Sequence, residues 1–350
     1  MKKILAVLFI FMLTMNIFAV DVTPTAVIRL DVGANVQLGD KYPAGNPGGD
    51  PTWNFNPFNN GTSIGVNAAG DNAGGWIHIR GNEHVYLGDT PGTTGTPGIF
   101  GEAWVNIGPT TLTIGRSEAW AQWNSISLFG DIGWAFGASA STDNPFIKLS
   151  VEGFYFGLSE AGVNGKYIGS KASVAPGDNA PFPGFFVGYD YAADAFSVGA
   201  TFAGQYVGDD VDDGSFPLMF NVHGKIPLDP ITLGLNVAFY IAPENAPGLF
   251  SINSAPENLI KGVGKSRVIE AMIDLSAAFD PCDIGFSGAF IMDTEAESYG
   301  FKTGACATFG ISGTGFSIIP GLIYTNILKI GGNDAKKSWL DVGVSCSYSY

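Results

Sequence analysis

Leu340-Asp-Val-Gly-Val-Ser-Cys-Ser-Tyr-Ser-Tyr350, the end of the chain, alternates between two kinds of side chain. Every second residue is apolar or aromatic, and the residues between them are small or polar. This period of two places the two kinds on opposite faces of a β-strand. In a water-soluble protein such a strand would be an unprotected sheet edge. In a membrane-spanning barrel it would close the wall, with one face toward lipid and the other toward a wet lumen.

The same alternation recurs along the chain, most clearly between Ile28 and Leu38. There the apolar residues alternate with glycine and polar residues, among them the charged Arg29 and Asp31. Full charges on one face suit a watery interior better than a protein core. The sequence therefore predicts an all-β fold, a transmembrane antiparallel β-barrel. Further strands with this pattern are expected at residues 196–206, 231–241, 269–279, 301–311 and 316–324.

The segments between the expected strands are alternately short and long. Short turns are expected at residues 108–110, 192–194, 228–230, 280–283 and 312–315, and longer loops at 39–61, 89–98, 159–184, 208–215, 242–265 and 326–337. This asymmetry is typical of bacterial outer-membrane barrels, in which short turns face the periplasm and long loops face outside. The pattern predicts about 16 strands. It leaves open whether the aromatic-rich residues 117–143 form a loop or two more strands, which would give about 18.

The N-terminus has the pattern of a secretory signal peptide. Lys2 and Lys3 precede an apolar run from Ile4 to Leu13, and the small residue Ala19 offers a cleavage point. We therefore expect residues 1–19 to be removed and residues 20–350 to form a single barrel domain in the bacterial outer membrane. The alternative is an uncleaved anchor helix, for which the apolar run is short.

Composition narrows the possible partners. The chain contains 49 Gly, 26 Phe and 12 Tyr, which favours twisted strands and tight turns over helices. Its formal net charge of −15 argues against nucleic acid, whose phosphates would be repelled. Cys282, Cys306 and Cys346 are odd in number and scattered, so we interpret them as small packing residues.

Patterns that could indicate catalysis or metal binding are weak. His78 and His84 share one parity of an expected strand with Arg80, but no nucleophile lies at a suitable spacing. The acidic run 209–214 resembles a calcium loop, yet Val211 breaks the required alternation of acids. We therefore expect no enzymatic activity, no cofactor and no metal site.

Two segments resemble known barrel sequences. Residues 102–116 resemble a hairpin of the general diffusion porins of Gram-negative bacteria, and residues 143–157 resemble the hairpin that follows it. The end of the chain resembles the signal by which outer-membrane barrels are recognised for assembly. The resemblance implies that the barrel-assembly machinery recognises Val342, Val344, Tyr348 and Tyr350.

In the porin family the loop after this first hairpin folds into the lumen and narrows it. The resemblance makes residues 117–143 a candidate pore-constricting loop, with acids on the loop facing basic residues on the wall. Such opposed charges set up a transverse field that favours polar solutes. The candidates are Glu118 and Asp131 on the loop, Arg116 on the wall by resemblance, and Arg29, Arg80 and Lys148 on the wall by parity or position.

Two of these arginines have alternative interpretations. Arg116 shares parity with Ile114, so strict alternation would point it toward lipid at a cost of about 2–4 kcal/mol near mid-membrane. Either a bulge at Gly115 turns it inward, or it lies at the rim and extends its charge into water. For Arg29, pairing with Asp31 or another neighbour is favoured over a role in selectivity.

The function expected from these features is passive diffusion of small hydrophilic solutes and ions through a water-filled barrel. The resemblance further implies a homotrimer embedded in outer-membrane lipid. The alternative is a surface protein or adhesin, in which the barrel is an anchor and the exterior loops bind partners.

Overall fold

The computed structural model describes residues 21–38, 52–57, 63–80, 98–116, 121–122, 138–140, 145–159, 184–204, 218–242, 251–252 and 266–350. The regular elements in these ranges are all strands: β1 (Asp21–Gln37), β2 (Thr52–Pro57), β3 (Ser63–Ala69), β4 (Ala73–Arg80), β5 (Gly98–Ile107), β6 (Thr110–Arg116), β7 (Ala121–Gln122), β8 (Ala138–Ala140), β9 (Pro145–Val151), β10 (Phe154–Ser159), β11 (Gly184–Ala193), β12 (Phe196–Gly204), β13 (Leu218–Leu228), β14 (Ile231–Ala242), β15 (Ser251–Ile252), β16 (Ser266–Phe279), β17 (Cys282–Asp293), β18 (Ser298–Ile311), β19 (Phe316–Ile330) and β20 (Asn333–Ser349). Among these described residues, none forms a helix with the length and hydropathy needed to cross a membrane.

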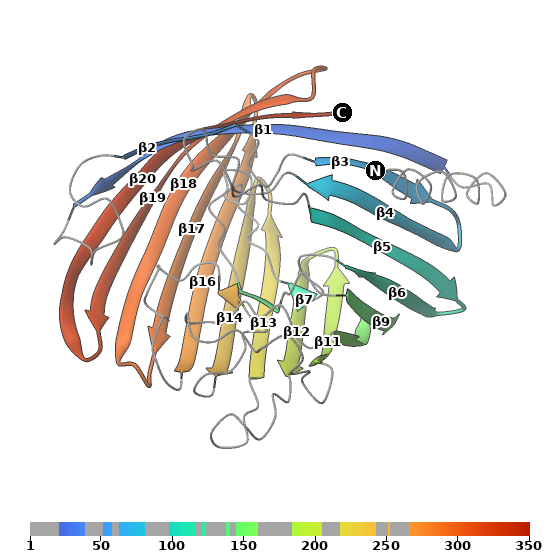
Figure 1. Ribbon diagram of the computed structural model, residues 1–350, viewed down its shortest axis with the longest axis horizontal. Coiled ribbons are helices and arrows are strands. Elements are labelled where there is room, and N and C mark those ends of the chain that lie inside the picture. The colour runs from blue at the N-terminus through green and yellow to red at the C-terminus, as the bar shows by residue number, and fades with distance from the viewer. Residues whose placement is uncertain are drawn as a thin grey trace, which may run out of the picture.

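The strands close into a ring of sixteen positions, which confirms the predicted antiparallel barrel. Around the ring, each strand pairs with its neighbour in the order β1, β3, β4, β5, β6, β9, β10, β11, β12, β13, β14, β16, β17, β18, β19, β20. The ring closes where β1 pairs with β20, from Val27 opposite Ser349 to Gln37 opposite Trp339. Figure 1 shows the C-terminus lying beside β1 at this seam. Closure gives each of the sixteen positions a paired neighbour on both sides, as a spanning sheet requires.

One strand lies inside a segment that was expected to be a long loop. β2 falls within residues 39–61 and pairs with β1 from Leu30 to Asn35. β3 pairs with the first part of the same edge of β1, from Asp21 to Val27. β2 and β3 therefore occupy one ring position in two pieces, and the prediction of an uninterrupted loop at 39–61 was wrong.

The two rims differ as predicted, with two exceptions. At the rim that holds both ends of the ring, seven tight turns connect successive strands. At the other rim lie the longer connections, but β17–β18 and β19–β20 are joined by the short segments 294–297 and 331–332. The expected loop at 326–337 is therefore wrong, because β19 and β20 continue through most of it.

A β-bulge explains why a loop was wrongly expected at residues 326–337. The register between β19 and β20 shifts between Ile327 and Lys329. An extra residue on one strand reverses the parity of everything beyond it, so a period of two no longer fits. Gly331 and Gly332, both at positive φ, then make the tight turn.

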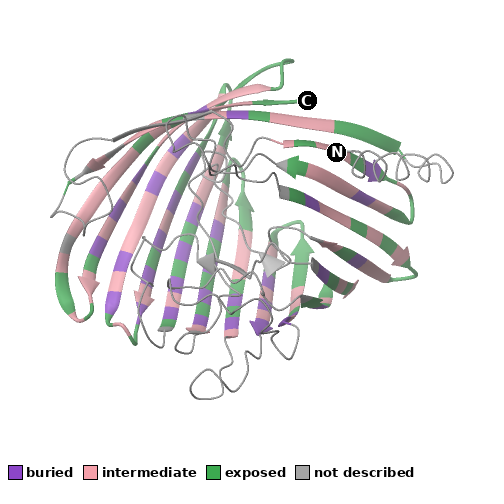
Figure 2. Ribbon diagram, in the orientation of Figure 1, coloured by how far each residue is buried: buried purple, intermediate pink, exposed green. Residues whose placement is uncertain are grey.

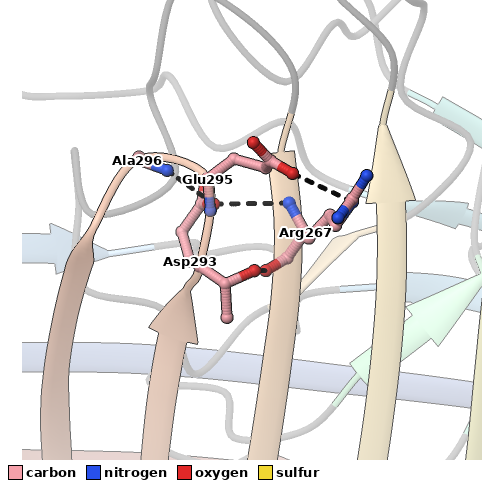
Figure 3. A network of polar contacts seen from close by, with 5 residues as sticks. Arg267, Asp293, Glu295 and Ala296 are labelled. Atoms are coloured by element: carbon pink, nitrogen blue, oxygen red, sulfur yellow. Dashed lines mark hydrogen bonds and ion pairs between the residues drawn. The ribbon is translucent and has the colours of Figure 1, made fainter.

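A network of polar contacts holds the other tight turn of this rim (Figure 3). The buried carboxylate of Asp293 accepts hydrogen bonds from the backbone N–H groups of Glu295 and Ala296, at 3.0 and 3.1 Å, and of Arg267, at 3.3 Å. The Arg267 guanidinium forms an ion pair with Glu295 at 3.0 Å. The turn is thus joined to the neighbouring strand β16 as well as to its own hairpin.

The wall has no extra hairpin between β6 and β9. β6 pairs directly with β9, from Thr110 opposite Val151 to Arg116 opposite Pro145. The strands within residues 117–143, β7 and β8, instead form a separate three-stranded sheet with β15. The alternative of about eighteen wall strands is therefore wrong.

Candidate functional site: the inner face of the barrel

The outer face of the ring is an apolar belt. On β14 the side chains of Leu235, Val237 and Phe239 are 47%, 53% and 37% exposed, while Asn236 and Ala238 between them are buried. Figure 2 shows this alternation of burial repeated on the neighbouring strands. An exposed belt this continuous matches the lipid-facing surface of a membrane barrel. Other members of the belt are Ile64, Ile114, Leu149, Phe156, Val187, Val198, Val222, Ile273, Phe286, Phe309, Leu322 and Val344.

The inner face carries the polar groups, and on β13–β17 they bond to one another. Asn221 donates its side-chain N–H to the Asn236 side-chain oxygen, and Ser287 donates its hydroxyl hydrogen to Asp274. All four of these residues are buried. Buried polar side chains are stable when they are paired in this way.

Charged residues of opposite sign lie on the same part of the inner face. Lys302 on β18 interacts electrostatically with Asp341 on β20 and with Glu270 on β16. The three residues share inward parity through the registers of β16 to β20. The wall therefore carries alternating acid, base and acid across five neighbouring strands, an arrangement suited to a polar lumen.

Three contacts on the inner face each cross a glycine. In every case two side chains on strands two positions apart meet over a glycine of the strand between them, and the three residues are in register. The distances are 3.3 Å between Thr25 Oγ1 and His78 Nε2, 2.5 Å between the Tyr155 and Thr201 hydroxyls, and 3.5 Å between Asp190 Oδ1 and His223 Nε2. These glycine bridges, as we call them, are Thr25–Gly65–His78, Tyr155–Gly188–Thr201 and Asp190–Gly199–His223.

The glycine bridges at Gly188 and Gly199 lie next to each other, and the second connects to the buried Asn221–Asn236 pair. His223 Nδ1 lies 3.1 Å from Asn221 Oδ1, and Asn221 in turn bonds to Asn236. Asp190 is more than half exposed, whereas Thr201 and Asn221 are buried. A band of polar contacts thus runs across β10 to β14, with its accessible groups on the lumenal side. Among the bridge residues, only His78 is a candidate from sequence, because the bridges depend on registers among three strands.

Two of the predicted wall residues are placed inward. Arg29 is buried on β1 and donates from Nε to the Ser345 hydroxyl at 3.1 Å. This partner lies on the neighbouring strand β20. Lys148 on β9 is half-buried and in register with Thr113, which is also inward and buried. The backbone of Arg80 pairs with Ser63 on the same inward parity, and its side chain lies outside the described part.

The remaining constriction candidates are Arg116, Glu118 and Asp131. The pairing of β5 with β6 continues without interruption from Ile107 opposite Thr110 to Gly101 opposite Arg116, so the bulge considered at Gly115 does not occur. Arg116 ends β6 on the parity of the outward, half-exposed Ile114, at the rim that carries the long connections. Glu118 and Asp131 lie outside the described residues, as do residues 1–19.

The residues of the expected assembly signal lie together on one face of β20. Val342, Val344 and Tyr348 are each about two-fifths exposed on the outer face, and Tyr350 is 77% exposed. Tyr350 joins the ring through backbone hydrogen bonds with Ala26, at 2.9 and 3.2 Å. The apolar side chains at the end of the chain thus lie on the outer face of the closed barrel.

Titratable residues do not gather into a metal-binding arrangement in the described ranges, where no cluster of three or more His, Cys, Asp or Glu residues is found. Cys282, Cys306 and Cys346 lie on separate strands and form no disulfide with one another. Cys306 is buried on the inner face.

Comparison with known proteins identifies the fold. No family model and no curated protein sequence matches this chain. Among solved structures, the outer-membrane channel DcaP of Acinetobacter baumannii matches with a TM-score of 0.62 and 13% identity, covering 95% of this chain and 97% of that one. The trimer form of OmpT, an outer-membrane protein of Vibrio cholerae, matches with a TM-score of 0.52 and 12% identity, covering 95% and 100%. A porin matches with a TM-score of 0.53 and 12% identity, covering 94% and 100%. The chain therefore has the fold of outer-membrane porins and channels, as the sequence predicted.

Proposed function

We propose that this protein is a bacterial outer-membrane channel through which small hydrophilic solutes and ions diffuse passively. The observation that carries the proposal is a closed ring of sixteen strand positions with an apolar outer belt and a polar inner face. Barrels of about 16–18 strands are wide enough to leave an aqueous passage, whereas small eight-stranded barrels are filled by their own side chains. The residues described give no support to a catalytic role, and no feature favours the adhesin alternative over the channel.

The passage is narrowed, on this proposal, by two segments that meet across the opening. Residues 117–143 leave the wall between β6 and β9, and residues 243–265 leave it between β14 and β16. Six wall strands separate these places on one side of the ring and ten on the other. Yet Ser139 of β8 pairs with Ser251 of β15. Segments rooted so far apart can meet by crossing the opening, and Figure 1 draws β7 within the outline of the barrel.

A disulfide tests the meeting of these two segments. In a chain whose three native cysteines are replaced by serine, Ser139→Cys together with Ser251→Cys should form a cross-link on mild oxidation. The two positions are Cα partners in an antiparallel pair, a separation that a disulfide spans. The cross-link is read as a mobility shift of the denatured protein that a reductant reverses.

The matched control pairs Ser139→Cys with Ser312→Cys, which lies in an exposed turn at the opposite rim. It should remain uncross-linked under the same oxidant. If both pairs cross-link to the same extent, or if neither does, the two segments are not held together and this account of the constriction is wrong.

The selectivity of the passage would depend on Arg29, Arg80 and Lys148 on the wall and on Glu118 and Asp131 in residues 117–143. The field between opposed charges orders water and favours polar over apolar solutes. Arg116, at a strand end on the outward parity, fits the rim interpretation, in which its side chain extends to water. A homotrimer in outer-membrane lipid is part of the same proposal, supported by the description of the matching OmpT structure as a trimer form. The mass of the intact assembly in mild detergent distinguishes a trimer from a monomer.

The outward residues at the end of β20 would serve as the recognition signal for the barrel-assembly machinery. Deleting Tyr350 should lower severalfold the amount of heat-modifiable, folded protein in the outer membrane, because assembly needs the terminal aromatic residue. The control is Ser349→Ala, which keeps the terminal tyrosine and should assemble normally. Equal amounts of folded protein from the two variants and the native chain would remove Tyr350 from the signal.

A further inference from the structure

The glycine bridge at Gly188 shows how a large side chain is kept against the wall. Tyr155 on β10 is in register with Gly188 on β11, which is in register with Thr201 on β12. Neighbouring strands are about 4.7–4.9 Å apart, so Tyr155 must extend across the whole of β11 to meet Thr201. Its hydroxyl does so, hydrogen-bonding to the Thr201 hydroxyl. The phenol ring therefore lies along the inner face and not out into the lumen.

This orientation of the Tyr155 ring depends on the absence of a side chain at position 188. A Cβ built on Gly188 would collide with Cζ and the hydroxyl oxygen of Tyr155. The other two glycine bridges share the restriction. A Cβ on Gly199 would lie 2.5 Å from His223 Nε2 and would collide with Asp190 Oδ1, and a Cβ on Gly65 would collide with the His78 ring.

We propose that Gly65, Gly188 and Gly199 are specificity-determining residues that set the bore of the channel. Each lets a long inner-face side chain lie flat across the neighbouring strand, where a polar partner holds it. A Cβ at any of them would force that side chain off the wall and into the passage. Tyr155 is partly buried and Asp190 is more than half-exposed, so both reach accessible space on the inner face. This inference depends on the proposed channel function.

The bridges also decide the class of solute that passes. With these side chains held flat, the inner face at this level presents the Asp190 carboxylate to the lumen, with the partly buried Tyr155 hydroxyl and the largely buried His223 imidazole beside it. Such a surface favours hydrated, uncharged or cationic solutes of small size over bulky apolar ones. A ring standing in the passage would lower the size limit and leave these polar groups unpaired.

Gly188→Ala tests the inference directly. We expect its single-channel conductance to fall by roughly a third or more, with a lower size limit for neutral solutes, because the displaced ring obstructs the passage. Adding Tyr155→Ala to the same chain should return both quantities to the native values or above them. The control is Gly288→Ala on the outer face, where the added Cβ would come no closer than 3.6 Å to another side chain. Its conductance should be native.

Three results would overturn the inference. One is a folded Gly188→Ala protein that conducts like the native channel. Another is a double variant that conducts no better than Gly188→Ala alone. The third is a large rise in conductance of the single variant Tyr155→Ala, which would mean that the native ring already stands in the passage. This variant adds no Cβ to the wall, so it does not depend on whether Gly188→Ala folds. If the native protein itself never conducts, the channel function fails, and that result is distinct from these three.

Discussion

Replacing Val222 with arginine is expected to destabilise the folded barrel by about 2–4 kcal/mol, the cost of a charge on the lipid face near the bilayer midplane. Val222 lies in the middle of β13, and its side chain is on the outer face, 38% exposed. Nothing in the hydrocarbon of the bilayer can solvate a guanidinium at that depth. The measurement is equilibrium unfolding by denaturant in phospholipid vesicles.

The adjacent residue provides a control at the same depth. His223 is on the inner face, next to Asp190 at 3.5 Å, so His223→Arg places the same charge beside a carboxylate in a wet lumen. We expect it to lower the free energy of unfolding by less than Val222→Arg does, because the new charge meets a carboxylate even though the imidazole contact with Asn221 is lost. Equal losses in the two variants would contradict the assignment of the two faces, and with it the membrane-spanning orientation of the barrel.

Removing the segment between β6 and β9 is expected to raise single-channel conductance by about twofold or more, because it would open the narrowest part of the passage. The wall should tolerate the change, since Arg116 already pairs with Pro145 at the point where the segment leaves. The variant replaces residues 118–143 with Asn-Gly, a dipeptide that closes tight hairpins. Conductance is measured in a planar bilayer.

The matching control shortens another connection at the same rim. Residues 205–217 join β12 to β13. The three-stranded sheet consists of β7, β8 and β15, which lie in other connections. Shortening 205–217 should leave the conductance near the native value. A folded 118–143 deletion that conducts like the native protein would show that this segment does not constrict the passage.

The sequence could predict the fold because membrane strands obey a simple period. In β1, β14 and β16 nearly every residue of one parity is apolar, and the structure places that parity outward. The pattern failed where the period is broken. The bulge between Ile327 and Lys329 reversed the parity, so the end of β19 and the start of β20 were taken for a loop. β2 was missed because it is short and flanked by Gly, Pro and Asn.

The inner face was harder to predict than the outer one. Parity or position made Arg29 and Lys148 wall candidates, and the registers of β1 and β9 place both on the inner face. The glycine bridges join residues that are far apart in the chain, such as Thr25 and His78 or Tyr155 and Thr201. Which glycine lies between them depends on the register of three strands. A single sequence fixes that register only when the turns are known.

Single-channel conductance of the refolded protein in a planar bilayer tests the central claim most directly. The account predicts discrete, ohmic steps, because a ring of sixteen strand positions with a polar inner face leaves a water-filled passage. A protein that is folded and heat-modifiable but never conducts would contradict the channel function, and would favour a barrel that serves as an anchor for its exterior loops.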